Sequence, residues 1–163
     1  SLFTAINKMA EKYDMPILYS CHPRSRNRLA ASGFQLDPRV IQHEPLGFHD
    51  YNCLQMNAFA VVSDSGTLPE ESSFFTSIDH PFPAICIRTS TERPEAIDKG
   101  DFIIAGIDEK SLLQAVDTAV ELCRDGQHGI PVPDYVDENV STKVVKIVQS
   151  YVGIVNKMVW RKF

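Results

Sequence analysis

Short apolar runs alternate with amphipathic segments along most of the chain, and this alternation constrains the fold more than any other feature. Runs typical of strands lie at residues 16–21, 39–43, 59–63, 83–88 and 101–105. Segments with helical spacing of apolar residues lie at 2–13, 24–32, 48–58, 68–76, 92–99 and 111–123. Strands that alternate with helices predict a doubly wound, Rossmann-like α/β domain with a parallel sheet. The run Pro16–Cys21 predicts a strand buried on both faces.

Helix-ending and helix-capping residues support these boundaries. Asp14 and Pro16 follow the first helix, Gly33 and Gly100 follow two later ones, and Asp108 stands three residues before Ser111 as an N-cap. A polar loop at 125–139 leads to a last helix. We expect one domain over residues 1–163, with residues 139–163 either packing on it or crossing to another half of the protein.

Composition indicates a globular chain with an acidic balance. The net charge of −5 disfavours nucleic acid and anionic membrane as principal partners, and no apolar stretch approaches the ~18 residues of a membrane span. Cys21, Cys53, Cys86 and Cys123 form no CxxC pair. They predict four buried, reduced thiols in a cytoplasmic protein. The histidines show no metal-ligand spacing, so we expect neither a metal nor a cofactor.

The first residue is Ser1, and a helical pattern begins at once, whereas an α/β domain usually opens with a strand. We therefore expect the chain to be a fragment of a longer protein.

The carboxyl ends of parallel strands are where ligands bind in such folds, so the segments that follow each strand are the candidate site. Ser65, Gly66 and Thr67 follow one strand and open a helix, where free N–H groups attract an anion. An ordinary strand-to-helix turn would carry the same residues. Glu70 and Glu71 suit the positive end of that helix, and either carboxylate is also suited to a ribose diol.

Other residues near strand ends can likewise be interpreted either as ligand contacts or as ordinary structural residues. Arg88 and Arg93 flank a hydroxyl-rich turn and form a plausible phosphate clamp, or else a solvated pair. Tyr51 can stack on a base or belong to the core. His22 can contact a phosphate or sugar or be structural, and Arg24 is the likeliest ligand contact of a basic helix face.

Three segments together resemble the C-terminal half of the non-hydrolysing UDP-N-acetylglucosamine 2-epimerases. These are Glu44-Pro45-Leu46, then Ser63-Asp64-Ser65-Gly66 with Glu70-Glu71, then Thr91-Glu92-Arg93-Pro94-Glu95-Ala96, in that order. The resemblance covers most of residues 2–107. It implies the second of two facing Rossmann-like domains, the GT-B arrangement, with UDP in the cleft between them.

The resemblance also implies roles for single residues. Tyr51 matches the aromatic residue that stacks on uracil, Ser65 and Gly66 the diphosphate contacts, Glu71 the ribose carboxylate and Arg93 the arginine of the third segment. His22, Arg24 and Arg88 are possible substrate contacts.

The family inverts C2 of the sugar by eliminating UDP and adding it back. Its acid and base groups belong mainly to the other domain, so the resemblance implies that this chain alone is inactive. It implies a homodimer for the full-length protein, whereas the fragment alone is expected to be monomeric.

Several segments depart from the commoner family pattern. Thr67-Leu68-Pro69 replaces Gly-Ile-Gln, and residues 75–82 form a longer connection. These features resemble the branch that makes a UDP-N-acetyl-L-fucosamine-type sugar for capsule or O-antigen. Two alternatives stay open: the C-terminal UDP-sugar-binding domain of a GT-B glycosyltransferase, and a non-catalytic nucleotide-sugar-binding module.

Overall fold

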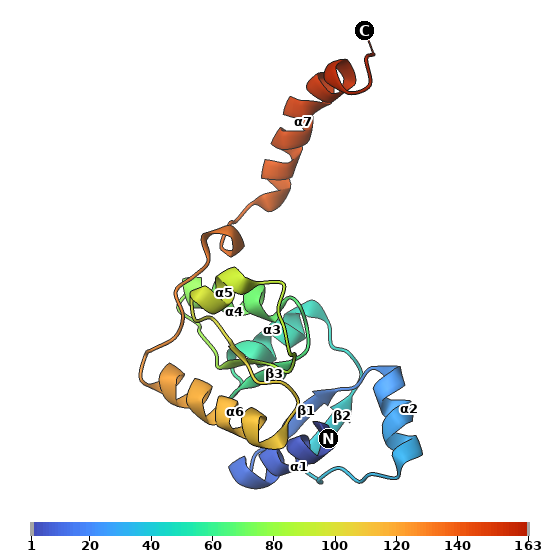
Figure 1. Cartoon of the computed structure of the whole chain (residues 1–163), viewed down its shortest axis with the longest axis vertical. Helices are drawn as coiled ribbons and strands as arrows, with labels where there is room; N and C mark the ends of the chain where they lie inside the picture. The colour runs from blue at the N-terminus through green and yellow to red at the C-terminus, as the bar shows by residue number, and fades with distance from the viewer. Residues whose placement is uncertain (1, 163) are drawn as a thin grey trace.

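The computed structural model describes residues 2–162, apart from the side chain of Pro23. Its helices are α1 (Leu2–Tyr13), α2 (Pro23–Ser32), α3 (Phe48–Met56), α4 (Leu68–Ser77), α5 (Pro94–Asp98), α6 (Glu109–Arg124) and α7 (Val140–Met158), with a short 3-10 helix η1 (Pro133–Tyr135). Its strands are β1 (Ile17–Ser20), β2 (Val40–His43), β3 (Val61–Ser63), β4 (Ala84–Cys86) and β5 (Ile103–Ile104). Figure 1 shows a rounded α/β body from which α7 projects.

All strand pairings in the described chain are parallel, which confirms the predicted α/β class. β1 pairs with β2, and β4 lies between β3 and β5. The expected single sheet is divided into two ladders, because no backbone pairing joins β1 to β3 within residues 2–162. The two ladders nevertheless share one hydrophobic core, which contains Tyr19 of β1 and Val62 of β3.

Strand β4 shows how the layers are built. Ile85 is fully buried in the core formed with α1 and α6, whereas its neighbours Ala84 and Cys86 belong to a second core formed with α4 and α5. Successive side chains of a strand point to opposite faces, so one strand supports both cores. The helices α1 and α6 therefore cover one face of the sheet, and α4 and α5 cover the other.

The predicted helix ends are confirmed where a local cause exists. Asp14 takes a left-handed conformation with φ 49° directly after α1, and Gly33 does the same after α2 with φ 65°. The carboxylate of Asp108 accepts a hydrogen bond from the backbone N–H of Ser111 at 3.0 Å. Several other boundaries differ by one or two residues. α5, for example, begins at Pro94 instead of Glu92, because the fixed φ of proline suits the first helical position.

Two burial predictions are wrong. Leu18 of β1 is 48% exposed, as is Ile41 beside it in β2, because in this region helices cover only one face of the strands. Of the four cysteines, Cys21 and Cys86 are buried, but Cys53 is exposed on α3 and Cys123 is only partly covered. An apolar sequence neighbourhood does not show which side of a helix faces the core.

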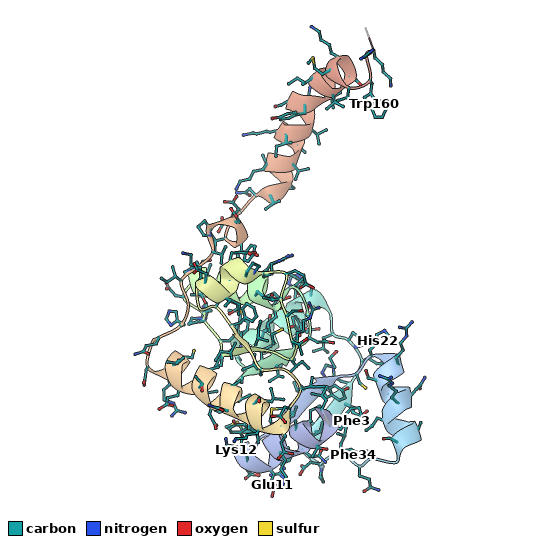
Figure 2. The ribbon with its side chains drawn as sticks, viewed as in Figure 1. Phe3, Glu11, Lys12, His22, Phe34 and Trp160 are labelled. Carbon is teal, nitrogen blue, oxygen red and sulfur yellow. The ribbon has the colours of Figure 1, made fainter. Side chains whose placement is uncertain are left out.

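The last helix stands apart from the domain. α7 runs away from the body in Figure 1, and none of its described residues is buried. Trp160, just beyond its end, is 65% exposed at the far tip (Figure 2). The described residues of α7 thus bury no side chain against the α/β body.

Candidate functional site

The candidate site is built where helices begin at the carboxyl ends of successive strands. α3 follows β2, α4 follows β3, and α5 follows β4. In a parallel arrangement these helix starts lie along one edge of the sheet. The residues that the sequence singled out are mostly in these first turns or in the loops before them.

Glu71 of α4 is the centre of a hydrogen-bonded cluster. One carboxylate oxygen, Oε2, accepts from the amide Nε2 of Gln55 at 2.6 Å and from the hydroxyl of Tyr51 at 3.4 Å. The other, Oε1, accepts from the hydroxyl of Thr67 at 2.8 Å. Two elements that are separate in sequence, α3 and α4, thus meet at this carboxylate.

The turn before α4 extends the cluster toward the strand. The Oγ of Ser65 lies 2.8 Å from the Oγ1 of Thr67 and also accepts from the backbone N–H of Thr67 at 3.2 Å. Thr67 is the N-cap of α4, yet its hydroxyl caps no backbone N–H of the helix. The positive helix terminus with its adjacent hydroxyls is therefore suited to an anion.

Tyr51 is half-buried in this cluster. Burial raises the pKa of its phenol to about 12, with a further contribution from the neighbouring Glu71 carboxylate. The phenol is consequently neutral at physiological pH and works as a hydrogen-bond donor to Glu71. The predicted Tyr51, Ser65 and Glu71 are thus brought together by a continuous chain of hydrogen bonds through Thr67.

Arg88 lies over the glycine of the turn. Its Nε donates to the carbonyl of Asp64 at 2.6 Å, and its Nη1 donates to the carboxylate of Glu92 at 2.8 Å. A Cβ added to Gly66 would lie 3.8 Å from Nη2 of Arg88. The guanidinium therefore stands beside the backbone that a diphosphate would approach, although the sequence ranked Arg88 only as a possible contact.

Arg93 is held one helical position away from the cluster. Its Nε and Nη2 both donate to Oε1 of Glu70, at 2.8 and 2.6 Å. Glu70 precedes Glu71 on α4, so Arg93 is attached to the same first turn but from a different side. The structure thus brings Arg88 against Gly66 and pairs Arg93 with a carboxylate.

His22 lies at the start of α2, just beyond the end of β1 (Figure 2), and Arg24 is in the first turn of that helix. The Nδ1 of His22 accepts a hydrogen bond from the backbone N–H of Arg24 at 3.3 Å, which makes His22 the N-cap of α2. A cavity of about 680 Å³ opens beside α2 and β2, lined by Arg26, Leu29, Ala30, Gly33, Phe34, Gln42, His43 and Glu44. Neither His22 nor Arg24 hydrogen-bonds to the Glu71 cluster.

Two residues of the cluster were not among the predicted ligand contacts. Thr67 was noted only as a source of a hydroxyl, and Gln55 was missed. The signal for Gln55 was its spacing, because a residue four positions after Tyr51 lies on the same helical face. Gln55 is 3% exposed, which hydropathy would not suggest for an amide.

No group of three or more His, Cys, Asp and Glu side chains within residues 2–162 is placed to hold a metal ion. No helix of that same range is long and apolar enough to cross a membrane.

Comparison with known proteins identifies the family. Residues 1–149 match the family model described as UDP-N-acetylglucosamine 2-epimerase. A curated UDP-N-acetylglucosamine 2-epimerase from Methanococcus maripaludis is 32% identical over 121 residues, which cover 71% of this chain and 31% of that protein. The chain therefore spans about a third of the length of this relative.

Solved structures agree with the sequence comparison. The UDP-N-acetylglucosamine 2-epimerase of Rickettsia bellii superposes with a TM-score of 0.85 at 36% identity, covering 99% of this chain and 43% of that one. The Methanocaldococcus jannaschii UDP-GlcNAc 2-epimerase in complex with UDP-GlcNAc and UDP gives a TM-score of 0.75 at 25% identity, covering 90% and 39%. This chain belongs to the UDP-N-acetylglucosamine 2-epimerase family.

Proposed function

We propose that this chain is the UDP-binding half of an enzyme that inverts C2 of a UDP-N-acetylhexosamine by eliminating UDP and adding it back. The observation that carries the proposal is the cluster in which Tyr51, Glu71 and Ser65 are linked at the carboxyl end of β3, beside Arg88 and Gly66. Family membership and the relative solved with UDP-GlcNAc and UDP support it.

Each part of UDP has a chemically suited partner in this cluster. The half-buried ring of Tyr51 offers a stacking surface for uracil. The Glu71 carboxylate accepts hydrogen bonds from the ribose hydroxyls. Ser65 and Gly66, at the N-terminus of α4, receive the diphosphate. Arg88 and Arg93 supply positive charge nearby, because a guanidinium matches phosphate oxygens in geometry.

The chain's contribution to the reaction is stabilisation of the leaving group. When the bond between the sugar C1 and the diphosphate oxygen breaks, the electron pair stays on UDP, whose negative charge increases. The helix N-terminus and Arg88 lie where that charge develops and lower its energy without reorganising. The groups that remove and return the C2 proton lie outside this chain in our proposal, so the chain alone binds UDP but does not epimerise.

Calorimetric titration of the 163-residue chain with UDP, uridine and ADP tests the binding role. We expect weak but saturable heat for UDP and much less for uridine, which lacks the diphosphate. A purine also stacks on a tyrosine ring, so the comparison with ADP measures how much the identity of the base contributes to affinity. Equal affinity for UDP and uridine would contradict the diphosphate role of Ser65 and Gly66, and no heat with millimolar UDP would contradict the proposal itself.

The inactivity of the chain alone has a direct assay. In deuterated water, removal and return of the C2 proton would place deuterium at C2 of UDP-GlcNAc, which proton NMR detects. We expect no deuterium at C2 when only this chain is present. Exchange catalysed by the chain would show that it carries its own acid and base groups.

Product and assembly follow as finer proposals. Thr67-Leu68-Pro69 and the long connection at 75–82 support a UDP-N-acetyl-L-fucosamine-type product for bacterial surface polysaccharide. We also propose a homodimer for the longer protein and a monomer for this chain. Light scattering of the chain should give about 18.3 kDa if it is monomeric.

A further inference from the structure

Gln55 is the most deeply buried polar side chain of the site. It lies near the end of α3, one helical turn after Tyr51, and is 3% exposed. Its amide faces α4 across the boundary between the two helices. The Gln55 amide thus places two N–H donors and one carbonyl acceptor at a buried position. An apolar side chain would be sufficient there for packing.

The amide nitrogen of Gln55 joins the two ligand-facing residues. Nε2 donates to Glu71 Oε2 at 2.6 Å and to the Tyr51 hydroxyl oxygen at 3.2 Å. The shorter of the two contacts is to the carboxylate assigned to ribose, so Glu71 is the residue that this nitrogen mainly holds in place. The hydroxyl of Thr67 restrains the other oxygen, Oε1, so the carboxylate is held from both sides.

The acceptor side of the same amide is unsatisfied. Oε1 of Gln55 is buried and has no hydrogen-bond partner among the described residues. A buried acceptor without a partner reduces stability. A methionine would fill the same space without that cost, so stability alone does not account for a glutamine here. The advantage of a glutamine at this position therefore lies in the hydrogen bonds that its amide nitrogen donates.

We propose that Gln55 is a positioning residue that orients Glu71 toward the ribose hydroxyls and thereby sets the preference for a ribonucleotide over a 2′-deoxyribonucleotide. This inference rests on the proposed UDP site. A carboxylate has about four lone-pair positions. Gln55 takes one on Oε2 and Thr67 one on Oε1, and the long 3.4 Å contact from Tyr51 is readily exchanged for a ligand hydroxyl. Each carboxylate oxygen can then accept from one hydroxyl of the diol.

The test compares UDP with 2′-deoxy-UDP on the chain and on Gln55→Met, by calorimetric titration. Methionine keeps the length and volume of the side chain but removes both donors. We expect the affinity for UDP to fall about tenfold and the affinity for 2′-deoxy-UDP to change by less than about twofold. The preference for UDP should therefore largely disappear.

Two further variants separate positioning from a general structural effect. Asn57→Ala is the matched control, because the exposed side-chain amide of this C-cap residue of α3 donates to the nearby carbonyl of Cys53 at 2.8 Å and not to the Glu71 cluster. Its preference for UDP should equal that of the parent chain. Adding Gln55→Met to Glu71→Ala should produce no further loss of UDP affinity, since Gln55 acts through Glu71.

The outcomes are distinguishable from a failure of the proposed function. If the parent chain does not bind UDP, the proposed function fails. If the parent chain binds UDP with a ribose preference and Gln55→Met keeps that preference, the positioning role is overturned. Equal losses for both nucleotides would also overturn it, because they would indicate general distortion of the site.

Discussion

The carboxylates of Glu71 and Asp101, one on α4 and one beside it, have opposite hydrogen-bonding surroundings. Glu71, at the candidate site, receives hydrogen bonds from Gln55, Thr67 and Tyr51. Asp101, which lies before β5 and contacts the same helix, is 6% exposed, and neither of its carboxylate oxygens has a hydrogen-bond partner among the described residues. One carboxylate is surrounded by hydrogen-bond donors and is the acceptor of ligand hydroxyls in our proposal, whereas the other is buried.

The enclosure of Asp101 comes from the connector between α6 and α7. The backbone of Gly129 lies against Asp101, Ile130 N–H donates to the carbonyl of Lys99 at 2.9 Å, and Val132 N–H donates to the hydroxyl of Ser73 at 2.7 Å. These contacts attach the connector to the domain directly over the carboxyl group. Hydrogen bonds from backbone N–H groups thus hold the connector in position. None of these contacts brings a charged group to the Asp101 carboxylate.

The pKa of Asp101 reflects its burial. Burial raises the pKa of Asp101 to about 6, and a weaker interaction with the Ser73 hydroxyl opposes the rise. Donors around a carboxylate favour its charged form, whereas burial without donors favours the protonated form. The comparison teaches that removing Glu71 should reduce ligand binding, whereas neutralising Asp101 should increase stability.

The largest expected effect is that of Gly129→Ala. A Cβ at this position would lie 2.4 Å from Oδ1 of Asp101 and 2.7 Å from its backbone nitrogen. We expect a loss of about 2–3 kcal/mol in the free energy of unfolding, measured by urea denaturation with circular dichroism. Gly153→Ala is the control, because a Cβ there meets nothing within 4 Å. Equal stability of the two variants would show that the connector is not held over Asp101.

The next effect is on ligand binding. Glu71→Ala removes the acceptor for the ribose diol and leaves the buried Gln55 amide without its 2.6 Å partner. We expect UDP affinity to fall about 30-fold in calorimetric titration, with the unfolding midpoint shifted much less. An unchanged affinity would place the ribose elsewhere and remove the contrast between the two carboxylates.

A smaller effect is expected from Asp101→Asn. The folded-state pKa of Asp101 is raised above its ordinary value of 3.8, so the folded chain holds the proton more tightly than the unfolded chain does. The stability linked to that proton is fully present below about pH 3.8 and is lost as pH rises through about 6. At pH 8 the neutral variant should therefore be more stable by on the order of 1–2 kcal/mol, with a flatter pH profile between 4 and 6.5.

Asp134→Asn provides the control for that measurement, because Asp134 is exposed on the same connector. Its pH profile should follow that of the parent chain. His128 also lines the small cavity beside Asp101, but no ion pair joins the two in the described residues. The variant His128→Gln should keep the pH dependence of stability seen in the parent chain. If His128→Gln abolished that pH dependence, the histidine and not Asp101 would be its source.

The smallest effect separates the two arginines. Both arginines form an ion pair, Arg88 with Glu92 and Arg93 with Glu70. Nη2 of Arg88 lies beside Gly66, whereas both Nε and Nη2 of Arg93 donate to Glu70. We expect Arg88→Ala to weaken UDP binding about tenfold and Arg93→Ala about twofold to threefold, because the Arg93 guanidinium is turned to Glu70 and not to the glycine turn. Uridine, which has no phosphates, should bind both variants equally. A larger loss for Arg93 would make it the main phosphate contact instead.

Local sequence patterns were sufficient for the element order. Strand and helix periodicity placed all five strands, because periodicity and chain direction are local properties. The strand-end rule led to Ser65 and Gly66 and the family resemblance to Glu71, and the structure brings these residues close together, while their ligand roles stay predictions. The boundaries at Gly33 and Asp108 were equally local, since each depends on one residue's backbone preference or capping group.

The contacts that could not be predicted depend on packing between elements. The role of Gln55 follows from the approach of α3 to α4, and the burial of Asp101 follows from a connector nearly thirty residues later in the chain. Neither distance can be read from composition or spacing. The exposure of Cys53 and Leu18 was mispredicted for the same reason, because apolar neighbours in sequence do not determine which face another element covers.

The projecting helix α7 has a consequence for how the chain denatures. It has 19 residues, none of them buried, and it therefore lacks the tertiary packing from which most helices in proteins gain their stability. Its melting should therefore be uncoupled from that of the α/β body, giving a shallow early loss of ellipticity before one cooperative transition. Trp160, the single tryptophan, lies beyond the end of that helix. Its fluorescence should therefore stay unchanged while the body unfolds.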